Sequence, residues 1–232
     1  MIHYLSLQQL PDTGDADGDR YRALAADLAP LERSLPGLVS RTVSRVYDRT
    51  HRQLSMAPAD IPVDAVTRLC FADYTALRQA LASSAFQRRR EVLVQTMARS
   101  TGLVVLSNEV IPRPAAVEGA PWLKRMGLFQ IKEGVSREAF RRWWFEQHGP
   151  SAANLPQLKA YVQNAVVDAV DERAPARELP AMRCDGVTEM WFEDLSAMEA
   201  AFPHRTATKI TQQASGLTER IATVLIEEDA AA

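Results

Sequence analysis

The sequence predicts an α+β protein in which two βαββαβ repeats pack against each other as one α/β barrel within a single chain. The first observation is self-similarity, since four stretches of the first half recur in the second half, each displaced by about 120 residues. Strand-like and helix-like segments also follow the same order in both halves, and the strand-like segments are apolar on both faces. The matched stretches are residues 2–10 with 123–131, 35–38 with 155–158, 66–73 with 187–194, and 105–106 with 224–225.

Each half is expected to open with a strand and to continue with a helix, at residues 19–33 and 136–148. Ser136 is a suitable N-cap for the later helix, because its hydroxyl can accept a backbone hydrogen bond. Asp73 and Asp194 stand in the same position ahead of the second helix of each half. The remaining strands are expected at residues 38–47, 66–71 and 103–110 of the first half and at 158–167, 187–192 and 221–227 of the second.

This order of elements describes the ferredoxin-like unit, an antiparallel sheet with both helices on one face. A linker marked by Pro112, Pro114, Gly119 and Pro121 separates the two predicted units, which are residues 1–111 and 122–228. Runs such as residues 103–106 (LVVL) show little polar alternation, so the face away from the helices is apolar as well. At roughly 25 cal/mol per Å² of buried apolar surface, two sheets packed face to face are strongly favoured.

The composition excludes several classes of protein. Apolar residues make up 47% and charged residues 24%, as in ordinary globular domains. The 27 Lys and Arg against 29 Asp and Glu give a net charge of -2, which argues against a nucleic-acid-binding protein. No apolar run approaches the roughly 18 residues of a membrane helix, and the N-terminus shows no secretory signal pattern. Cys70 and Cys184 give no metal or redox spacing and are expected to be reduced, as in a cytoplasmic protein. No metal and no cofactor are expected.

The densest signal for chemistry lies at residues 140–150 (FRRWWFEQHGP). Phe140, Trp144 and His148 fall on one stripe of the predicted helix, and Trp143 flanks this stripe. We therefore expect His148 to point in the same direction as the aromatic rings, toward the sheet.

The end of this helix determines the expected pKa of His148. Gly149 suits the left-handed conformation that ends a helix, and Pro150 stops the helix there. In a last helical turn the dipole favours the charged imidazolium, whereas burial opposes it. We therefore expect a pKa near neutrality, where a proton shuttle works best. The alternative is a packed histidine that is satisfied by a backbone carbonyl.

The first half supplies different side chains at the matching positions. Leu28 stands where the second half has His148, and Arg68 stands where it has Glu189. Because a leucine suffices for packing, His148 needs another reason to be present. We expect that only the second half places polar groups in its interior.

Glu189 lies within an apolar strand, where a carboxylate is costly to bury without a partner. Two interpretations remain open, an acid–base pair with His148 or a salt bridge with Arg68 across the barrel. Tyr161 and Asn164 are three residues apart, so on a regular strand they face opposite sides of the sheet. Asn164 is the less usual strand residue, and its amide suits the orientation of a carbonyl or hydroxyl group.

These motifs together resemble the EthD family of the dimeric α/β-barrel superfamily, over most of residues 122–228. The resemblance implies a fused pair that stands in for a homodimer, with a degenerate first copy. It implies His148 as the family's helix-end histidine, with Tyr161, Asn164 and Glu189 as further site residues. Related barrels include monooxygenases of polyketide aromatics, cyclases, muconolactone isomerases and haem-degrading enzymes, so the fold does not settle the function. The motifs are residues 140–144 (FRRWW), 148–150 (HGP), 155–158 (LPQL), 161–164 (YVQN) and 185–192 (DGVTEMWF).

The leading hypothesis is an EthD-like enzyme that acts without a metal on a small apolar molecule, aromatic or lactone-like, as an isomerase, cyclase, lyase or monooxygenase. His148 is the expected general acid/base, and Glu189 polarises it or takes a second proton. The alternatives are a non-catalytic binder of a hydrophobic metabolite, a haem-binding barrel and a purely structural barrel. No nucleic-acid or membrane partner is expected, and the fused barrel neither needs nor forbids a homodimer. The expected substrate-binding residues are Phe140, Trp143, Trp144, Tyr161 and Asn164.

Overall fold

The N-terminal half forms one four-stranded sheet with helices on one side in the computed structural model, which describes residues 1–11, 19–50, 56–113, 122–173, 182–203 and 205–228. The carboxylate of Asp73 accepts a hydrogen bond from the N–H of Ala76 at 2.9 Å, which confirms the predicted helix cap. The elements are β1 (Ile2–Gln9), α1 (Asp19–Arg33), β2 (Leu38–Asp48), β3 (Ala65–Phe71), α2 (Tyr74–Ala82), α3 (Ser84–Thr96) and β4 (Arg99–Ile111).

The C-terminal half follows the same plan with a more divided helix layer. Ser136 and Asp194 cap α4 and α6 by accepting hydrogen bonds from backbone N–H groups, as predicted. The elements are β5 (Leu123–Ile131), α4 (Arg137–Trp143), η1 (Trp144–His148), α5 (Gly149–Ala152), β6 (Ala160–Asp171), β7 (Gly186–Phe192), α6 (Leu195–Ala201), α7 (Arg205–Ala214) and β8 (Thr218–Glu228).

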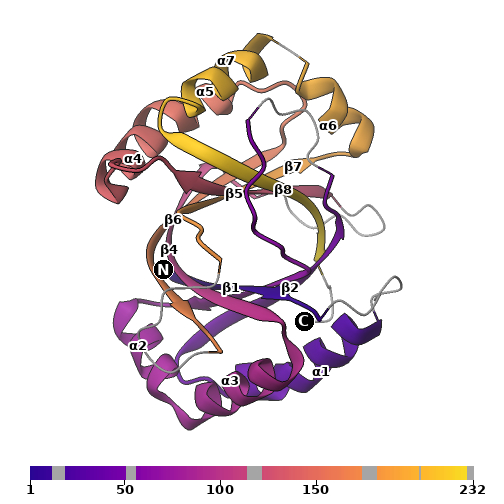
Figure 1. Cartoon of the computed structure of the whole chain (residues 1–232), viewed down its shortest axis with the longest axis vertical. Coiled ribbons are helices and arrows are strands. Elements are labelled where there is room, and N and C mark those ends of the chain that lie inside the picture. The colour runs from indigo at the N-terminus through magenta and orange to yellow at the C-terminus, as the bar shows by residue number, and fades with distance from the viewer. Residues whose placement is uncertain (12–18, 51–55, 114–121, 174–181, 204, 229–232) are drawn as a thin grey trace.

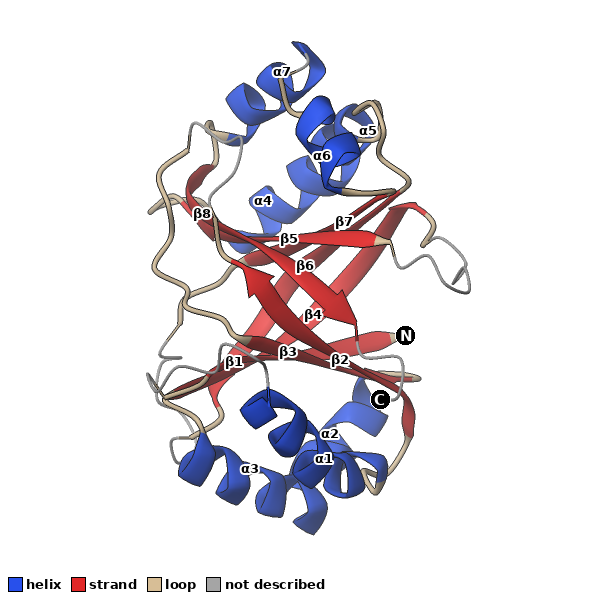
Figure 2. Ribbon diagram, turned by 90° about the vertical axis from the view of Figure 1, so that its right-hand side faces the viewer, coloured by secondary structure: helices blue, strands red, loops and turns tan. Residues whose placement is uncertain are grey.

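The strands close into one antiparallel barrel in the order β1-β3-β2-β8-β5-β7-β6-β4. The two halves join where β2 pairs with β8 and where β4 pairs with β6. Figures 1 and 2 show the helices in two layers on opposite sides of this barrel, α1–α3 on the N-terminal strands and α4–α7 on the C-terminal strands. The α+β barrel expected from the sequence is therefore confirmed, whereas the linker residues 114–121 lie outside the described part of the chain.

Side chains of each strand alternate between the barrel interior and a helix layer. Both directions are apolar, which explains why the strand-like runs of the sequence show little polar alternation. The interior is filled by a cluster that includes Leu5, Leu103, Val105, Met126, Val187 and Val224.

A buried polar network lies between the N-terminal strands and their helices. Its centre is Glu172, which follows β6 and thus comes from the C-terminal half. Its carboxylate forms an ion pair with Arg89 of α3. It also accepts hydrogen bonds from the hydroxyls of Tyr4, Ser6 and Ser100.

Arg89 is fully buried as well, and its Nε donates to Glu32 of α1 at 2.7 Å. Although burial alone raises the pKa of Glu172, the Arg89 guanidinium and the hydroxyl donors lower it below its usual value. The expectation that only the C-terminal half places polar groups in its interior is therefore wrong. Alignment of the halves did not reveal this network, because its central carboxylate crosses from one half to the other.

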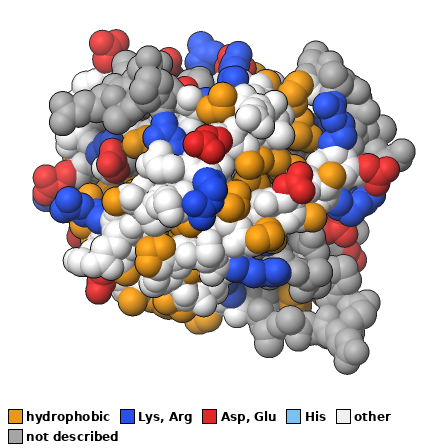
Figure 3. All heavy atoms as spheres, turned by 90° about the horizontal axis from the view of Figure 1, so that it is seen from below, with side chains coloured by type: hydrophobic (Ala, Val, Ile, Leu, Met, Phe, Trp, Pro, Cys, Tyr) orange, Lys and Arg blue, Asp and Glu red, His pale blue; other side chains and the backbone are white. Residues whose placement is uncertain are grey.

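The outer surface carries charges of both signs. On the face that lies below the view of Figure 1, basic and acidic side chains are interspersed with hydrophobic ones (Figure 3). Within the described ranges, none of the helices combines the length and the apolar character needed to cross a membrane.

Replacing the crossing carboxylate tests how strongly it stabilises the fold. We expect Glu172→Gln to lower the free energy of unfolding by about 3 kcal/mol, because it leaves part of the Arg89 charge buried without a counter-charge. Urea denaturation measures this quantity. The control is Glu91→Gln at an exposed position of α3, for which we expect a change within about 0.5 kcal/mol. Equal effects of the two substitutions would contradict the assigned role.

Candidate functional site

His148 lies in the layer between the C-terminal strands and their helices. The predicted stripe is confirmed, because Phe140, Trp144 and His148 are only 2%, 1% and 4% exposed. The ring centroids of Trp143 and His148 are 5.0 Å apart. Gly186 of β7 makes room for these rings, since a Cβ at that position would lie 2.9 Å from the Trp144 ring.

The helix does not end at His148. In the π-helical turn η1, the N–H of Gly149 bonds to the carbonyl of Trp144, five residues earlier, and the helix continues through α5. Gly149 has a helical φ of -55°, so the expected left-handed cap is wrong. Glycine is required here for space, because a Cβ would lie 2.7 Å from Oε1 of Gln163. Turns of this kind are rare and concentrate at functional sites.

Burial lowers the pKa of His148 to about 4, below the near-neutral value that the sequence predicts. The difference has a structural cause, since the chain stays helical over residues 149–152 and His148 is not in a last turn. The imidazole is therefore neutral at physiological pH. Its Nδ1 is buried and has no hydrogen-bond partner in the described part of the chain, so this nitrogen is not satisfied by a backbone carbonyl there.

Gln163 of β6 holds the π-helical turn against the sheet. It is fully buried, and its Nε2 donates to the carbonyl oxygen of Trp144 at 2.8 Å. Its Oε1 accepts a hydrogen bond from Nδ2 of Asn108 on β4 at 2.9 Å, so the N-terminal half supports the turn that carries His148. Sequence reasoning missed Gln163, although an amide within an apolar strand was the signal that singled out Asn164.

Tyr161 lies on the same side of the sheet as His148 and is fully buried. Nε2 of Gln163 donates a hydrogen bond to its phenol oxygen at 3.1 Å. Burial raises the pKa of Tyr161, so its phenol stays protonated and acts only through hydrogen bonding.

Glu189 and Asn164 face the barrel interior. The carboxylate of Glu189 forms ion pairs with Arg68 and with Nζ of Lys124, the latter at 2.6 Å. Nδ2 of Asn164 donates a hydrogen bond to Glu189 at 2.8 Å. The salt bridge between Glu189 and Arg68, one of the two interpretations of the sequence, is therefore present. Asn164 and Tyr161 face opposite sides of the sheet, as predicted.

The sheet itself separates His148 from Glu189. Along β7, Val187 and Glu189 lie on the same face of the strand, and Val187 packs in the hydrophobic cluster of the barrel interior. Gly186 and Met190 lie on the opposite face and contact the helix layer. Direct proton exchange between His148 and Glu189 is not supported by this arrangement.

Lys124 of β5 is a further titratable residue in the barrel interior, beside Glu189, and the sequence did not single it out. Its Nζ also pairs with Glu228 and lies 4.7 Å from the centroid of the Trp191 ring. Burial lowers the pKa of Lys124 to about 7, although the nearby Glu228 opposes this shift. The available signal was its alternation with Met126 and Leu128, which face the interior.

The cysteines and the possible metal ligands of the described ranges form no further candidate site. Cys70 and Cys184 are unpaired and buried, and burial raises the pKa of Cys184 to about 12, so this thiol is a poor nucleophile. Over the same ranges, the structure brings together no group of three or more His, Cys, Asp and Glu side chains that could hold a metal ion.

Comparison with known proteins finds a family model that is similar to part of the chain. Residues 132–219 match the model of the EthD domain. This match includes the α4–η1–α5 helix, Gln163 and Glu189. No curated protein matches the sequence.

Solved structures that cover nearly the whole chain share its fold. An anthrone oxidase-like protein is 11% identical with a TM-score of 0.68, over 98% of this chain and 91% of that one. A putative monooxygenase from Fusobacterium nucleatum is 7% identical with a TM-score of 0.58, over 98% and 91%. One from Lactobacillus acidophilus is 10% identical with a TM-score of 0.53, over 99% and 94%. At these identities the similarity concerns the fold alone.

The lowered pKa of His148 predicts a pH dependence of stability. A histidine whose folded-state pKa is about 4, against 6.5 when unfolded, contributes stability above pH 6.5 that is lost as the pH falls toward 4. We expect the stability difference between the wild type and His148→Gln to shrink by about 3 kcal/mol between pH 7 and pH 4. Urea denaturation at both pH values measures it, and a constant difference would contradict the buried neutral imidazole.

The contact between Gln163 and the π-helical turn predicts a change at His148 itself. We expect Gln163→Leu to loosen the turn and to raise the pKa of His148 from about 4 toward 6.5, because the imidazole gains solvent. Titration of the imidazole by NMR measures this pKa. The control is Gln130→Leu on β5, whose amide bonds to the backbone of Arg183 and should leave the titration unchanged.

Proposed function

Because residues 132–219 match the model of the EthD domain, we propose that the C-terminal half binds a small apolar molecule, aromatic or lactone-like, beside His148, and that His148 acts as its general base. The observation that carries the proposal is the state of this side chain. A neutral imidazole, whose buried Nδ1 has no partner among the described residues, is held by a π-helical turn that is itself fixed to the sheet.

The low pKa defines the order of proton transfers. A neutral His148 first accepts a proton from a carbon or hydroxyl of the substrate and becomes an imidazolium. The same proton then passes to a second atom of the substrate, which gives isomerisation or cyclisation, or to a departing hydroxyl, which leaves as water. Because the buried imidazolium is unfavourable, the second transfer is strongly driven.

The aromatic side chains divide into two roles in this proposal. Phe140 and Trp144 are almost fully buried and pack against each other with centroids 5.1 Å apart, so they shape the layer. Trp143 is half-buried and stacks against His148, so it is the indole best placed to contact a ligand. Tyr161 supports the site through its hydrogen bond with Gln163.

Glu189 and Asn164 have no direct part in the proposed reaction. Their hydrogen bond and the ion pairs with Arg68 and Lys124 lie on the interior face of the sheet. We propose instead that they join the two halves, which we regard as tandem repeats covering residues 1–111 and 122–228, the first a degenerate copy. The cytoplasmic location and a homodimer of fused barrels stay predictions.

Two alternatives remain for the His148 site. The low basicity of the imidazole favours a non-catalytic binder of a hydrophobic metabolite, since such a protein needs no proton transfer. A haem ligated by His148 fits less well, because Trp143 packs against the imidazole and Phe140 and Trp144 fill the surrounding layer.

A panel of anthrones, aromatic ketones and unsaturated lactones tests the proposal, with ligand binding and chemical conversion measured separately. We expect His148→Gln to reduce the turnover of a converted compound by about 100-fold or more while binding persists. The control is Glu146→Gln, an exposed neighbour in the same turn. Full turnover in His148→Gln would contradict the proposal, and bound compounds that are always recovered unchanged would identify a binder.

A further inference from the structure

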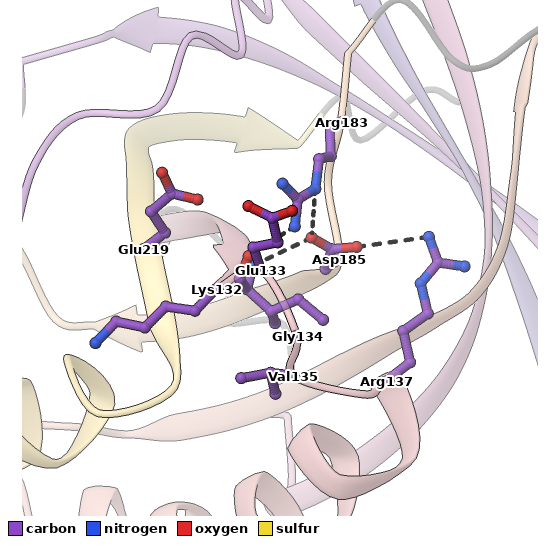
Figure 4. Close-up of a pocket in the computed structure, with 9 residues that line it drawn as sticks. Lys132, Glu133, Gly134, Val135, Arg137, Arg183, Asp185 and Glu219 are labelled. Atoms are coloured by element: carbon purple, nitrogen blue, oxygen red, sulfur yellow. Dashed lines mark hydrogen bonds and ion pairs between the residues drawn. The ribbon is translucent and has the colours of Figure 1, made fainter.

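A charged pocket lies at the opposite end of α4 from His148 (Figure 4). Its volume of about 670 Å³ lies within the range of small-molecule sites. The turn between β5 and α4, the segment before β7 and the start of β8 form its walls. Its charged lining residues are Lys132, Glu133, Arg137, Arg183, Asp185 and Glu219.

Asp185 is the buried centre of this pocket, only 4% exposed. Its Oδ2 accepts hydrogen bonds from the N–H of Ile131 and from Nε of Arg183, both at 3.1 Å. Arg183 in turn donates from Nη2 to the carbonyl of Ile131 at 2.6 Å. One carboxylate oxygen and one guanidinium are thereby fixed before any ligand arrives.

The other oxygen of Asp185 is weakly bonded. Oδ1 contacts Nη2 of Arg137 at 3.5 Å, which is longer than the roughly 2.7–3.2 Å of a good N–H···O bond. The Arg137 side chain is 50% exposed, so it can turn toward a ligand at low cost. A buried carboxylate oxygen with so loose a partner favours a stronger donor, such as an ammonium group.

The charges around the pocket balance each other. Three cationic side chains and three carboxylates line it, so a simple anion or a simple cation meets repulsion as well as attraction. A neutral molecule that carries both charges meets a complementary group at each end. Placed between Arg137 and Asp185, it replaces one long contact with two short charge-assisted ones.

We propose that this pocket binds a small zwitterion with an ammonium and a carboxylate on the same carbon atom, the arrangement found in α-amino acids. The ammonium donates to Oδ1 of Asp185, and the carboxylate accepts from the guanidinium of Arg137. This site is separate from His148 and does not depend on the function proposed for it.

Calorimetric titration of the full chain at constant ionic strength tests the proposal. The probes are L-alanine, L-leucine and L-phenylalanine, with acetate and ethylamine as single-charge controls. We expect at least one amino acid to bind with a stoichiometry of one and about tenfold more tightly than either control. Equal binding of acetate would identify an anion site and overturn the proposal. Lack of saturable binding by all three amino acids up to about 10 mM would also overturn it.

Two substitutions assign the binding to this pocket. Arg137→Gln removes the carboxylate partner at a half-exposed position, and we expect it to weaken binding about tenfold or more. The matched control is Arg142→Gln on the same helix, which is exposed and pairs only loosely with Glu138. Asp185→Asn removes the charge that binds the ammonium, so we expect no amino-acid binding by this variant. Circular dichroism verifies that the variant is folded. Unchanged affinity in Arg137→Gln would exclude this pocket as the site.

Discussion

Closure of the strands into a single barrel is the constraint on which the other features depend. A closed sheet has no free edge, so each strand residue faces either the interior or one helix layer. This rule places Glu189, Asn164 and Lys124 in a polar cluster within the barrel, and Gln163 and Tyr161 in the layer that contains His148. The reaction proposed for His148 would therefore use groups of the helix layer.

Burial rather than the helix dipole determines the state of His148. The helix continues to Ala152, so His148 does not lie in the last turn, where the helix dipole would stabilise an imidazolium. The resulting neutral base packs against the Trp143 ring, and its turn is anchored through the Trp144 carbonyl to Gln163. Such an environment suits a reaction in which a proton leaves and returns to the same apolar molecule.

The sequence was a good guide to features set by local rules. Helix caps at Asp73, Ser136 and Asp194 and the buried stripe through His148 follow from short-range patterns. The π-helical turn was not predictable, because Gly-Pro usually ends a helix and the reason for glycine, contact with Gln163, lies in another element. The partner of Arg89 was hidden for a related reason, since Glu172 reaches it from the other half of the chain.

The position of Glu172 bears on whether the halves can exist apart. Cut from its partner, the C-terminal half would carry this carboxylate into water, and the N-terminal half would retain Arg89 with Glu32 as its remaining counter-charge. If the barrel arose by fusion of two identical subunits, the contribution of Glu172 to the N-terminal half now disfavours a return to separate subunits. Each half contributes four strands, yet the N-terminal half relies on a carboxylate of the C-terminal half to balance Arg89.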